Sequence, residues 1–188
     1  NRSAISKYIY GKKVLVTGAG GSIGSELVKQ CLSFDPGLLI LFDQSENNLF
    51  HVDNMCTEYS SKIHIQPILG DIRDKSILHS VFSSFEPDVV LHAAAYKHVP
   101  MQELNPWEAV NTNIQGTINL VEASELHNVE RFVLVSTDKA VNPTNVMGAS
   151  KRVAEQVIQA RSVDTNVKYM AVRFGNVIGS SGSVIPTF

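Results

Sequence analysis

Three polar side chains that could move protons stand next to one another, at Thr137, Asp138 and Lys139. They directly follow the apolar run Phe132 to Ser136, which is typical of a buried strand. In an open parallel sheet the ligand binds at the carboxyl ends of the strands, so chemistry is expected at this place. A hydroxyl, a carboxylate and an amine there form a candidate catalytic group, with an ordinary polar loop as the alternative.

Met147 and Lys151 form a second candidate pair, four residues apart. Residues at this spacing share one face of a helix, so the two side chains are expected to point the same way. The spacing equals that of the Tyr-x-x-x-Lys pair of short-chain dehydrogenases, with methionine in place of tyrosine. Because methionine cannot ionise, Met147 cannot be the base that tyrosine would supply, and apolar packing beside a substrate is its expected role.

A glycine-rich segment runs from Gly18 to Gly24, between the first expected strand and the first expected helix. Gly18 permits a tight turn, Gly21 lets the backbone approach a pyrophosphate, and Gly24 allows the helix to pack closely on the strand. Ser22 and Ile23 open the helix, whose free N–H groups and positive dipole end attract an anion. Such segments often serve only as turns, but the flanking strand and helix favour a dinucleotide site.

Asp43 ends the second expected strand. A carboxylate there can accept hydrogen bonds from both hydroxyls of a cofactor ribose, and it repels the 2′-phosphate that distinguishes NADP. No arginine follows nearby to bind such a phosphate, so the sequence favours NAD as the cofactor over NADP. The alternative is that Asp43 caps a helix or is solvated.

Two further stretches fit the same cofactor. Asp71 and Ile72 follow the third expected strand, where the aspartate could receive the adenine amino group while the isoleucine packs on the ring. The alternative for Asp71 is an N-cap of the helix expected from Lys75. The fourth expected strand ends in small side chains that would let a cofactor lie close to the backbone, at Ala93, Ala94 and Ala95.

Strands and helices that alternate along the chain must position these residues. Short apolar runs predict six strands, at Lys13–Thr17, Leu38–Phe42, Ile63–Leu69, Val89–Ala93, Phe132–Ser136 and Lys168–Phe174. Amphipathic segments, one of them with Ser45 as its N-cap, predict helices over 22–34, 45–59, 75–85, 106–126 and 146–162. The alternation predicts an α/β fold: a Rossmann-like, doubly wound parallel sheet with strand order 3-2-1-4-5-6 and helices on both faces.

Length and composition bound the remaining possibilities. The 188 residues fit one domain, and 44% hydrophobic against 18% charged residues allows a large core. The net charge of −2 predicts no nucleic-acid or membrane-surface partner through bulk charge. The apolar runs are too short to span a bilayer, and Cys31 and Cys56 match no metal spacing, which favours reduced thiols in the cytoplasm.

Four longer segments carry a specific resemblance, namely His92–Pro100, Asn111–Thr117, Ser136–Pro143 and Arg173–Val177. Together they resemble the UDP-N-acetylglucosamine 4,6-dehydratases of surface-polysaccharide and glycan biosynthesis, in the extended short-chain dehydrogenase/reductase superfamily. Met147 resembles the branch that retains configuration at C5, since the inverting branch carries tyrosine there. The family's catalytic unit extends far beyond this length, so 1–188 is expected to be a fragment that lacks most of the nucleotide-sugar lobe.

The resemblance implies removal of water across C5 and C6 of the sugar, with NAD accepting a hydride from C4 and returning it to C6. Lys139 is then the base for the C5 proton, and Asp138 the acid for the departing C6 hydroxyl. Burial and nearby positive charge would lower the pKa of Lys139, and a dry pocket would raise that of Asp138. Lys151 is expected to hold the nicotinamide ribose and Thr137 the C4 oxygen. The base for the C4 hydroxyl is either Asp138 or a water held by Thr137.

The resemblance also implies roles for residues outside these groups. Asn113 would fix the active-site helix beside the cofactor or be a buried structural amide, and Lys97 would approach the sugar or solvate a loop. Asn176 resembles a contact to the substrate diphosphate. The implied partners are a UDP-sugar and further copies of the chain, paired through the helices over 106–126 and 146–162. Many family members carry an N-terminal membrane region, so anchoring to the inner face of the cell membrane is the alternative to a free cytoplasmic protein.

Two other functions share part of this pattern. A nucleotide-sugar 4-epimerase would have the same glycine loop, but it should carry tyrosine at position 147 and does not need Asp138 and Lys139. A non-catalytic NAD-binding module could keep the loop and lose the chemistry, which the presence of Lys151 argues against.

Overall fold

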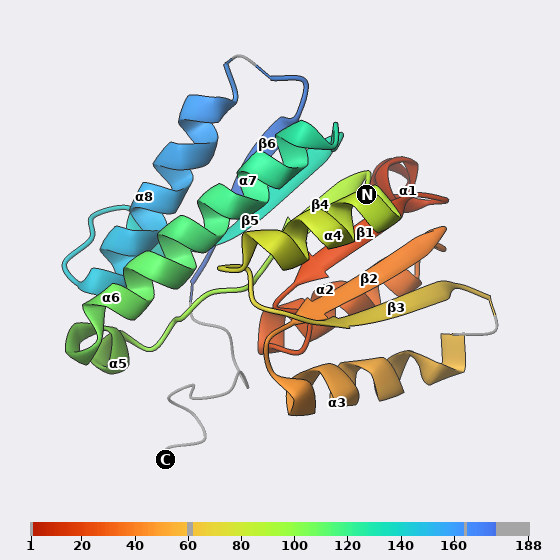
Figure 1. Cartoon of the computed structure of the whole chain (residues 1–188), viewed down its shortest axis with the longest axis horizontal. Helices are drawn as coiled ribbons and strands as arrows, with labels where there is room; N and C mark the ends of the chain where they lie inside the picture. Colours follow the sequence, from red (N-terminus) through yellow and green to blue (C-terminus); the bar gives the residue numbers. More distant parts are fainter. Residues whose placement is uncertain (1, 60–61, 164, 176–188) are drawn as a thin grey trace.

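Six parallel strands form the centre of the computed structural model, which describes residues 2–59, 62–163 and 165–175 (Figure 1). In space they lie in the order β3-β2-β1-β4-β5-β6. Their bounds are β1 Lys13–Thr17, β2 Leu38–Asp43, β3 His64–Leu69, β4 Val89–His92, β5 Arg131–Thr137 and β6 Lys168–Phe174. The predicted Rossmann-like sheet and its strand order are confirmed, and no strand end differs from its predicted position by more than one residue.

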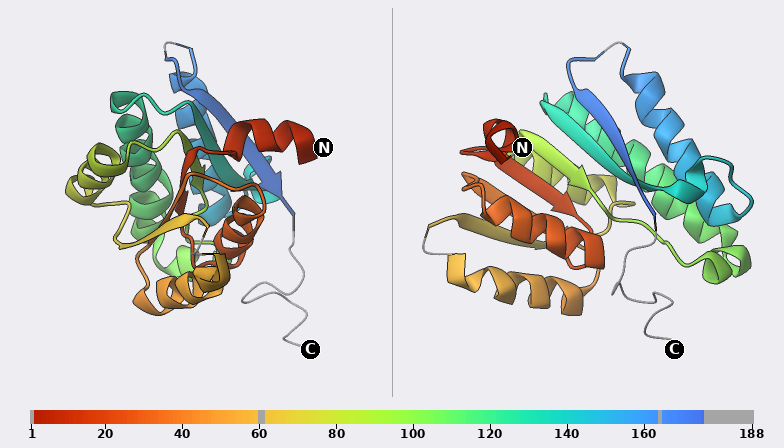
Figure 2. Two further views of the ribbon diagram at one scale, coloured as in Figure 1. Left: turned by 90° about the vertical axis from the view of Figure 1, so that its right-hand side faces the viewer. Right: turned by 180° about the vertical axis from the view of Figure 1, so that it is seen from behind.

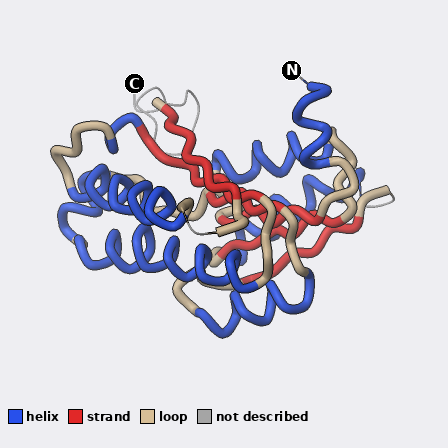
Figure 3. The backbone as a smooth tube through the Cα atoms, turned by 90° about the horizontal axis from the view of Figure 1, so that it is seen from above, coloured by secondary structure: helices blue, strands red, loops and turns tan. Residues whose placement is uncertain are grey.

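Helices cover both faces of this sheet (Figures 2 and 3). One face packs against α2 (Ser22–Leu32) and α3 (Glu46–Cys56). The other packs against α4 (Lys75–Phe85), α7 (Gly116–Leu126) and α8 (Val146–Arg161). The strands between two helical layers are apolar on both sides, which is why they appear in the sequence as continuous hydrophobic runs.

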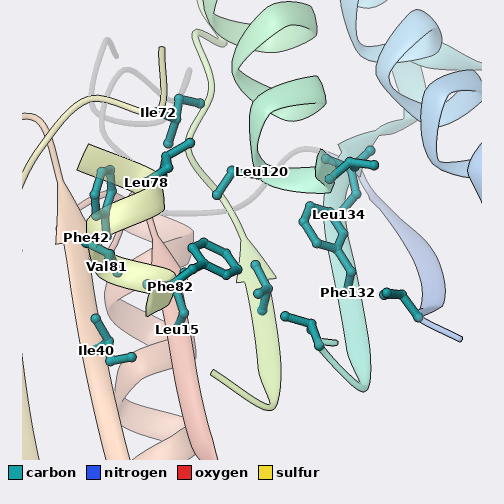
Figure 4. Close-up of a cluster of buried hydrophobic side chains, with 14 of the residues drawn as sticks. Leu15, Ile40, Phe42, Ile72, Leu78, Val81, Phe82, Leu120, Phe132 and Leu134 are labelled. Atoms are coloured by element: carbon teal, nitrogen blue, oxygen red, sulfur yellow. The ribbon is translucent and has the colours of Figure 1, made fainter. Parts of the chain in front are cut away.

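Two cores result, and the larger one lies on the side of α4, α7 and α8 (Figure 4). Leu15 of β1 faces this core, which also contains Phe82 of α4 and Phe132 of β5. Its neighbours on β1, Val14 and Val16, face the opposite core. A shift of one residue in register would exchange these two sets, so burial on both sides fixes the pairing of the strands. The fixed register brings the carboxyl ends of β1, β2, β4 and β5 to one edge of the sheet.

The helical segments differ from expectation in two places. The helix expected over 106–126 is interrupted: α6 (Pro106–Ala109) passes into a π-helical turn, η2 (Val110–Gln115), before α7 begins. Two short helices were not expected, α1 (Arg2–Ile9) and α5 (Val99–Leu104). Both bury a single residue in the structure, so they leave little apolar periodicity in the sequence.

Among the described helices, none is both long and apolar enough to cross a membrane. Cys31 and Cys56 are free thiols in the smaller core. Burial raises the pKa of Cys31 to about 12 and that of Cys56 to about 11, so neither is a reactive thiolate near neutral pH. Within the described ranges no three His, Cys, Asp or Glu residues gather into a group that could hold a metal ion.

Candidate cofactor and catalytic site

The glycine loop between β1 and α2 has contacts that exclude larger residues. Gly18 has a positive φ of 66°, and a Cβ there would lie 2.7 Å from the backbone of Ala94, which follows β4. A Cβ on Gly24 would lie 1.9 Å from the Gly18 carbonyl oxygen, so the close approach of helix and loop requires glycine. Helix α2 begins with Ser22 and Ile23, and its N-cap, Gly21, has no side chain to cap it. The positive end of the helix dipole therefore lies at the loop.

Asp43 lies beside this loop at the end of β2. Its Oδ2 accepts a hydrogen bond from the Gly20 N–H at 2.9 Å, and its Oδ1 accepts one from the Ser45 N–H at 2.9 Å. The cap of α3 is Ser45, as predicted, because its hydroxyl accepts from the Asn48 N–H. Since Asp43 is buried and does not cap the helix, both alternatives to the cofactor role lose their support. The carboxylate keeps lone pairs for further donors.

A cavity of about 180 Å³ lies between the glycine loop and the ends of β2 and β4. Seven residues predicted to bind the cofactor line it together: Gly18, Gly21, Asp43, Ile72, Ala93, Ala94 and Ala95. Pockets that enclose a whole drug-sized ligand measure roughly 300 Å³ or more. The cavity is therefore suited to one nucleoside of a dinucleotide, with the remainder lying across the sheet edge.

Thr112 lines the same cavity, although its place in the sequence gives no sign of this. The residue is 4% exposed, and its Oγ1 has no hydrogen-bond partner among the described residues. A buried hydroxyl without a partner is unfavourable, so it points to a ligand or a water that would satisfy it. Thr112 lies in the π-helical turn η2, and such turns are frequent at functional sites. An apolar cavity with an acceptor carboxylate and an unpaired hydroxyl fits a nucleoside.

Asp71 and Ile72 take different positions. Ile72 lines the cavity, and Gly116 makes room for it, since a Cβ there would lie 2.5 Å from Ile72 Cδ1. The Asp71 carboxylate instead pairs with Arg73 at 2.6 Å. Burial opposes ionisation of Asp71, but the hydrogen bonds from Arg73 outweigh it and lower the pKa of the carboxyl. The N-cap alternative for Asp71 is wrong, because Asp74 accepts from the first-turn N–H groups of α4.

Thr137, Asp138 and Lys139 lie together where β5 passes into the 3₁₀ turn η3 (Asp138–Ala140). Asp138 Oδ1 accepts hydrogen bonds from Thr137 Oγ1 at 2.9 Å and from Lys139 Nζ at 3.2 Å. These bonds, the one from Thr137 first, lower the pKa of Asp138. The expected rise is wrong for this chain because the Asp138 side chain is 55% exposed, and the expected burial of Lys139 is not found, because its side chain is 38% exposed.

Met147 and Lys151 share a buried face of α8, as the helical spacing predicts. Gly148 lets this helix lie close to the η3 turn, since a Cβ there would lie 2.6 Å from the Lys139 carbonyl oxygen. Lys151 is 6% exposed, and its side chain takes part in none of the side-chain hydrogen bonds or ion pairs found between the described residues. Burial lowers the pKa of Lys151 to about 8, against the opposing field of Glu155. Its N–H donors therefore remain for a ligand.

A buried histidine, to which sequence patterns assign no role, links the end of β1 to α7. His92 Nδ1 lies 2.7 Å from Thr17 Oγ1, and its Nε2 lies 3.0 Å from Thr117 Oγ1. Thr117 donates its one hydroxyl proton to the Asn113 carbonyl oxygen at 2.7 Å, so Nε2 must be the donor to Thr117, and Nδ1 must accept from Thr17. Burial and the charge of Lys151 lower the pKa of His92 to about 3, which keeps this neutral tautomer.

The remaining predicted residues lie outside the cavity. Asn113 is used by the protein itself: its Oδ1 accepts from the Tyr96 N–H, and its Nδ2 donates to the Tyr96 carbonyl and to Ser150 Oγ on α8. These bonds correspond to its expected roles as a buried amide and as a tether of the active-site helix. Lys97 is exposed next to this tether, and Asn176 lies outside the described residues.

The known proteins to which the chain is similar include proteins of polysaccharide biosynthesis and enzymes that act on nucleotide sugars. A family model described as "Polysaccharide biosynthesis protein" matches residues 14–188. The chain is 48% identical to the capsular polysaccharide biosynthesis protein CapD of Staphylococcus aureus, over 98% of this chain and 31% of that protein. It is 36% identical to a UDP-N-acetylglucosamine 4,6-dehydratase (inverting) of Campylobacter jejuni, over 95% of this chain and 53% of that protein. It is also 36% identical to a UDP-glucose 4-epimerase of Rickettsia bellii, over 94% and 52%.

Solved structures agree with this placement. Pen from Bacillus thuringiensis superposes with a TM-score of 0.86 at 38% identity, over 96% of this chain and 55% of that one. A double mutant of DesIV, a dTDP-glucose 4,6-dehydratase from Streptomyces venezuelae solved with NAD and DAU bound, superposes with a TM-score of 0.74 at 26% identity, over 86% of this chain and 55% of that one. The chain spans from about a third to about a half of the length of these relatives. Because the family model matches residues 14–188 of the 188, the chain belongs to the polysaccharide biosynthesis protein family, within the short-chain dehydrogenase/reductase superfamily.

Proposed function

We propose that this chain is the cofactor-binding part of a UDP-N-acetylglucosamine 4,6-dehydratase, a lyase that forms a UDP-4-keto-6-deoxy sugar for surface polysaccharide or glycan biosynthesis. The observation that carries the proposal is the contact between Asp138 and Lys139 at 3.2 Å, next to a helix on which Met147 replaces an ionisable residue. Elimination of water requires one group that takes the C5 proton and a second that gives a proton to the C6 hydroxyl, and the neighbouring Lys139 and Asp138 side chains are candidates for the two. The similarity to the Campylobacter dehydratase supports this assignment.

We infer that 1–188 forms a Rossmann domain and that the complete enzyme adds a lobe for the nucleotide sugar. The relatives leave room for such a lobe, because the chain spans 31% of CapD and 53% of the Campylobacter dehydratase. Lys97 and Asn176 would reach the sugar and its diphosphate from this chain. Substrate and lobe would shield Asp138 from water, and loss of solvation raises the pKa of a carboxyl toward the value an acid needs.

Each residue of the catalytic stretch then has one role in the proposed reaction. Lys139 takes the C5 proton, and Asp138 gives a proton to the C6 hydroxyl as it leaves. Thr137 holds the C4 oxygen, and Met147 packs against the sugar. The proton of the C4 hydroxyl goes to Asp138, before that residue acts as the acid, or to a water held by Thr137.

A nicotinamide cofactor, when bound, would supply the hydride acceptor and donor of this reaction. We propose NAD, and the complex of DesIV with NAD supports the choice. Asp43 would accept hydrogen bonds from the adenosine ribose, and Ile72 would pack on the adenine. Thr112 would offer its unpaired hydroxyl within the same cavity, and Lys151 would donate to the nicotinamide ribose.

NAD is expected to bind more tightly than NADP. The substitution Asp43→Ala is expected to reduce this difference in affinity. The carboxylate accepts from ribose hydroxyls and repels a 2′-phosphate, so its loss should weaken NAD binding by about tenfold while NADP binding improves. Calorimetry with both nucleotides measures this change. Asp53→Ala, which removes a carboxylate outside the cavity, should leave the ratio unchanged, and tighter binding of NADP by the unaltered chain would reject the preference.

Thr112→Val is expected to stabilise the ligand-free chain and to weaken its binding of NAD. Valine has nearly the shape of threonine without the hydroxyl, so it removes an unsatisfied buried group worth about 1 kcal/mol. It also removes a hydrogen bond to the bound nucleotide, which should weaken binding by about fivefold. Thermal unfolding and calorimetry measure the two effects, with Thr112→Ser as the control that keeps the hydroxyl. Lower stability with unchanged affinity would show that Thr112 is only a packing residue.

A nucleotide-sugar 4-epimerase is the second candidate, because the chain is equally similar to the Rickettsia epimerase. The two are separated by incubating the complete enzyme with UDP-N-acetylglucosamine and following the sugar by NMR. A dehydratase gives a 4-keto sugar with a C6 methyl group, and in deuterated water the C5 position takes up deuterium. An epimerase gives the C4 epimer with the C6 hydroxyl intact, and an unchanged substrate would indicate a non-catalytic NAD-binding module. Either of the last two results rejects the proposal.

We also infer that the complete enzyme is a homo-oligomer that acts in the cytoplasm or on the inner face of the cell membrane. The outer surfaces of α7 and α8 expose apolar residues such as Leu126 and Val153, which a second copy could cover. Light scattering at micromolar concentration should therefore give at least twice the mass of one chain, and a monomer would contradict the inference.

A further inference from the structure

Glu155 is a buried carboxylate on α8 to which the proposed reaction assigns no role. It is 6% exposed and accepts hydrogen bonds from three side chains. Ser136 Oγ donates at 2.6 Å, Arg173 donates through Nε and Nη2 at 2.9 Å and 2.7 Å, and Arg152 Nη1 donates at 3.2 Å. These bonds, the fork from Arg173 first, lower the pKa of Glu155 to about 2, so the carboxylate is charged near neutral pH.

The contacts of Glu155 join α8 to β5 and β6, and Figure 1 shows these three elements next to one another. Ser136 and Arg173 face each other across β5 and β6, and Ser136 directly precedes Thr137. Glu155 therefore holds the last part of the β5–β6 ladder against α8, next to the catalytic stretch. Because these hydrogen bonds hold the Glu155 side chain in one place, its negative charge also has a fixed position.

Glu155 also lies four residues beyond Lys151, on the same buried face of α8. Two titratable groups interact electrostatically with Lys151: Glu155 itself, and His92 on β4, which is neutral. Asp138 is paired with Lys139 on η3, and Glu125 of α7 is paired with Arg161. Glu155 is itself paired with Arg152 and Arg173, but the side chains of these arginines are 40% and 41% exposed, so water screens their charges more than that of the buried carboxylate. Burial of Lys151 favours its neutral amine, whereas the fixed negative charge of Glu155 favours the ammonium.

We propose that Glu155 is a positioning residue of this site, which keeps Lys151 in its ammonium form by placing a fixed negative charge one helical turn away. The ammonium has three N–H donors and a positive charge, whereas the neutral amine has two donors and no charge. Glu155 thereby determines up to what pH Lys151 can bind its ligand as a cation. The identity of this ligand as the nicotinamide ribose rests on the proposed function. The effect of Glu155 on the charge of Lys151 does not.

The test is an NMR titration of the chain with isotopically labelled lysine side chains, in which the Lys151 signal is assigned by its absence from Lys151→Met. Glu155→Gln keeps the shape of the side chain and an acceptor for Ser136, but it removes the charge. It should lower the titration midpoint of Lys151 by about one pH unit, a tenfold change in the protonation equilibrium. Arg152→Met removes a cation that partly cancels the field of Glu155, so it should raise the midpoint.

The opposite directions separate the charge effect from a loosened structure. If Glu155 only held β5 and β6 in place, both variants would leave the midpoint unchanged or move it the same way, and either result would overturn the proposal. Arg152 is partly exposed, so its variant should fold even if Glu155→Gln does not, and an unchanged or lowered midpoint in Arg152→Met alone is sufficient to reject the idea.

Glu125→Gln is the matched control, because it removes an ion-paired carboxylate from α7 and should leave Lys151 unaffected. The titration needs neither substrate nor cofactor, so its outcome is independent of the dehydratase assay. Opposite shifts together with a failed assay would retain the role of Glu155 and reject the proposed reaction.

Discussion

Lys139→Ala in the complete enzyme is expected to stop the reaction between oxidation at C4 and loss of water. The first step needs no amine at this position, whereas removal of the C5 proton needs a base. Loss of a positioned general base lowers the rate by about a hundred- to ten-thousand-fold. The variant should accumulate a bound 4-keto sugar that retains its C6 hydroxyl, and it should fail to exchange the C5 proton with deuterated water. Mass spectrometry and NMR of the recovered sugar measure both effects.

Two controls separate a base from a partner in an ion pair. Lys139→Arg keeps a cation beside Asp138, but a guanidinium does not lose its proton at working pH, so this variant should be about as slow as the alanine variant. Lys75→Ala removes an exposed lysine of α4 that pairs with Glu122 of α7, and it should leave turnover unchanged. Near-normal turnover of Lys139→Ala, or normal exchange at C5, would move the base to Asp138 or to a residue of the added lobe.

The sheet could be predicted closely because its signal is local. The inner strands are buried on both sides, so each appears as an apolar run whose bounds lie close to those of the strand, as for β1 and β2. The run of β6 gives the bounds of that strand as well, although most of its residues are exposed. The helices were predicted less well where contacts between distant parts of the chain determine the local backbone conformation. The π-helical turn η2 lies inside a segment with helical apolar spacing, and the contact between Gly116 and Ile72 that lies next to it joins parts of the chain far apart in sequence.

The same distinction applies to the site. The tight turn at Gly18, the close packing at Gly24 and the place of Asp43 beside the loop could be predicted, because each follows from a position at a strand end or a helix start. Thr112 and His92 could not be predicted in this way. Thr112 stands out because its buried hydroxyl has no hydrogen-bond partner among the described residues, and His92 because it contacts threonines of two different elements. The direction of the pKa shift of Asp138 was wrong for a related reason: burial depends on what covers the residue, and strand position does not determine this.

Lys151→Met is expected to act in opposite directions on activity and on stability. In the complete enzyme it removes the donor to the cofactor ribose, and kcat/KM should fall by about a hundredfold or more, since a misplaced reactant is enough to produce such a loss. In the ligand-free chain it removes a buried cation. Burial lowers the pKa of Lys151 from 10.5 to about 8, which corresponds to about 3 kcal/mol that opposes folding at neutral pH. Methionine fills nearly the same space without a charge, so the free energy of unfolding at pH 7 should rise by a similar amount.

The pH dependence of this gain identifies its cause. The folded-state pKa of Lys151 is depressed, so between about pH 8 and pH 10.5 the unfolded chain binds more protons than the folded chain, and the stability of the unaltered protein rises with pH in that window. Lys151→Met lacks this rise. Urea unfolding should therefore show the largest difference between the two proteins below pH 8 and almost none near pH 10.5. Lys75→Met, at an exposed position, should show no such convergence. A difference that is constant across pH would mean that packing, and not the charge of Lys151, determines the change.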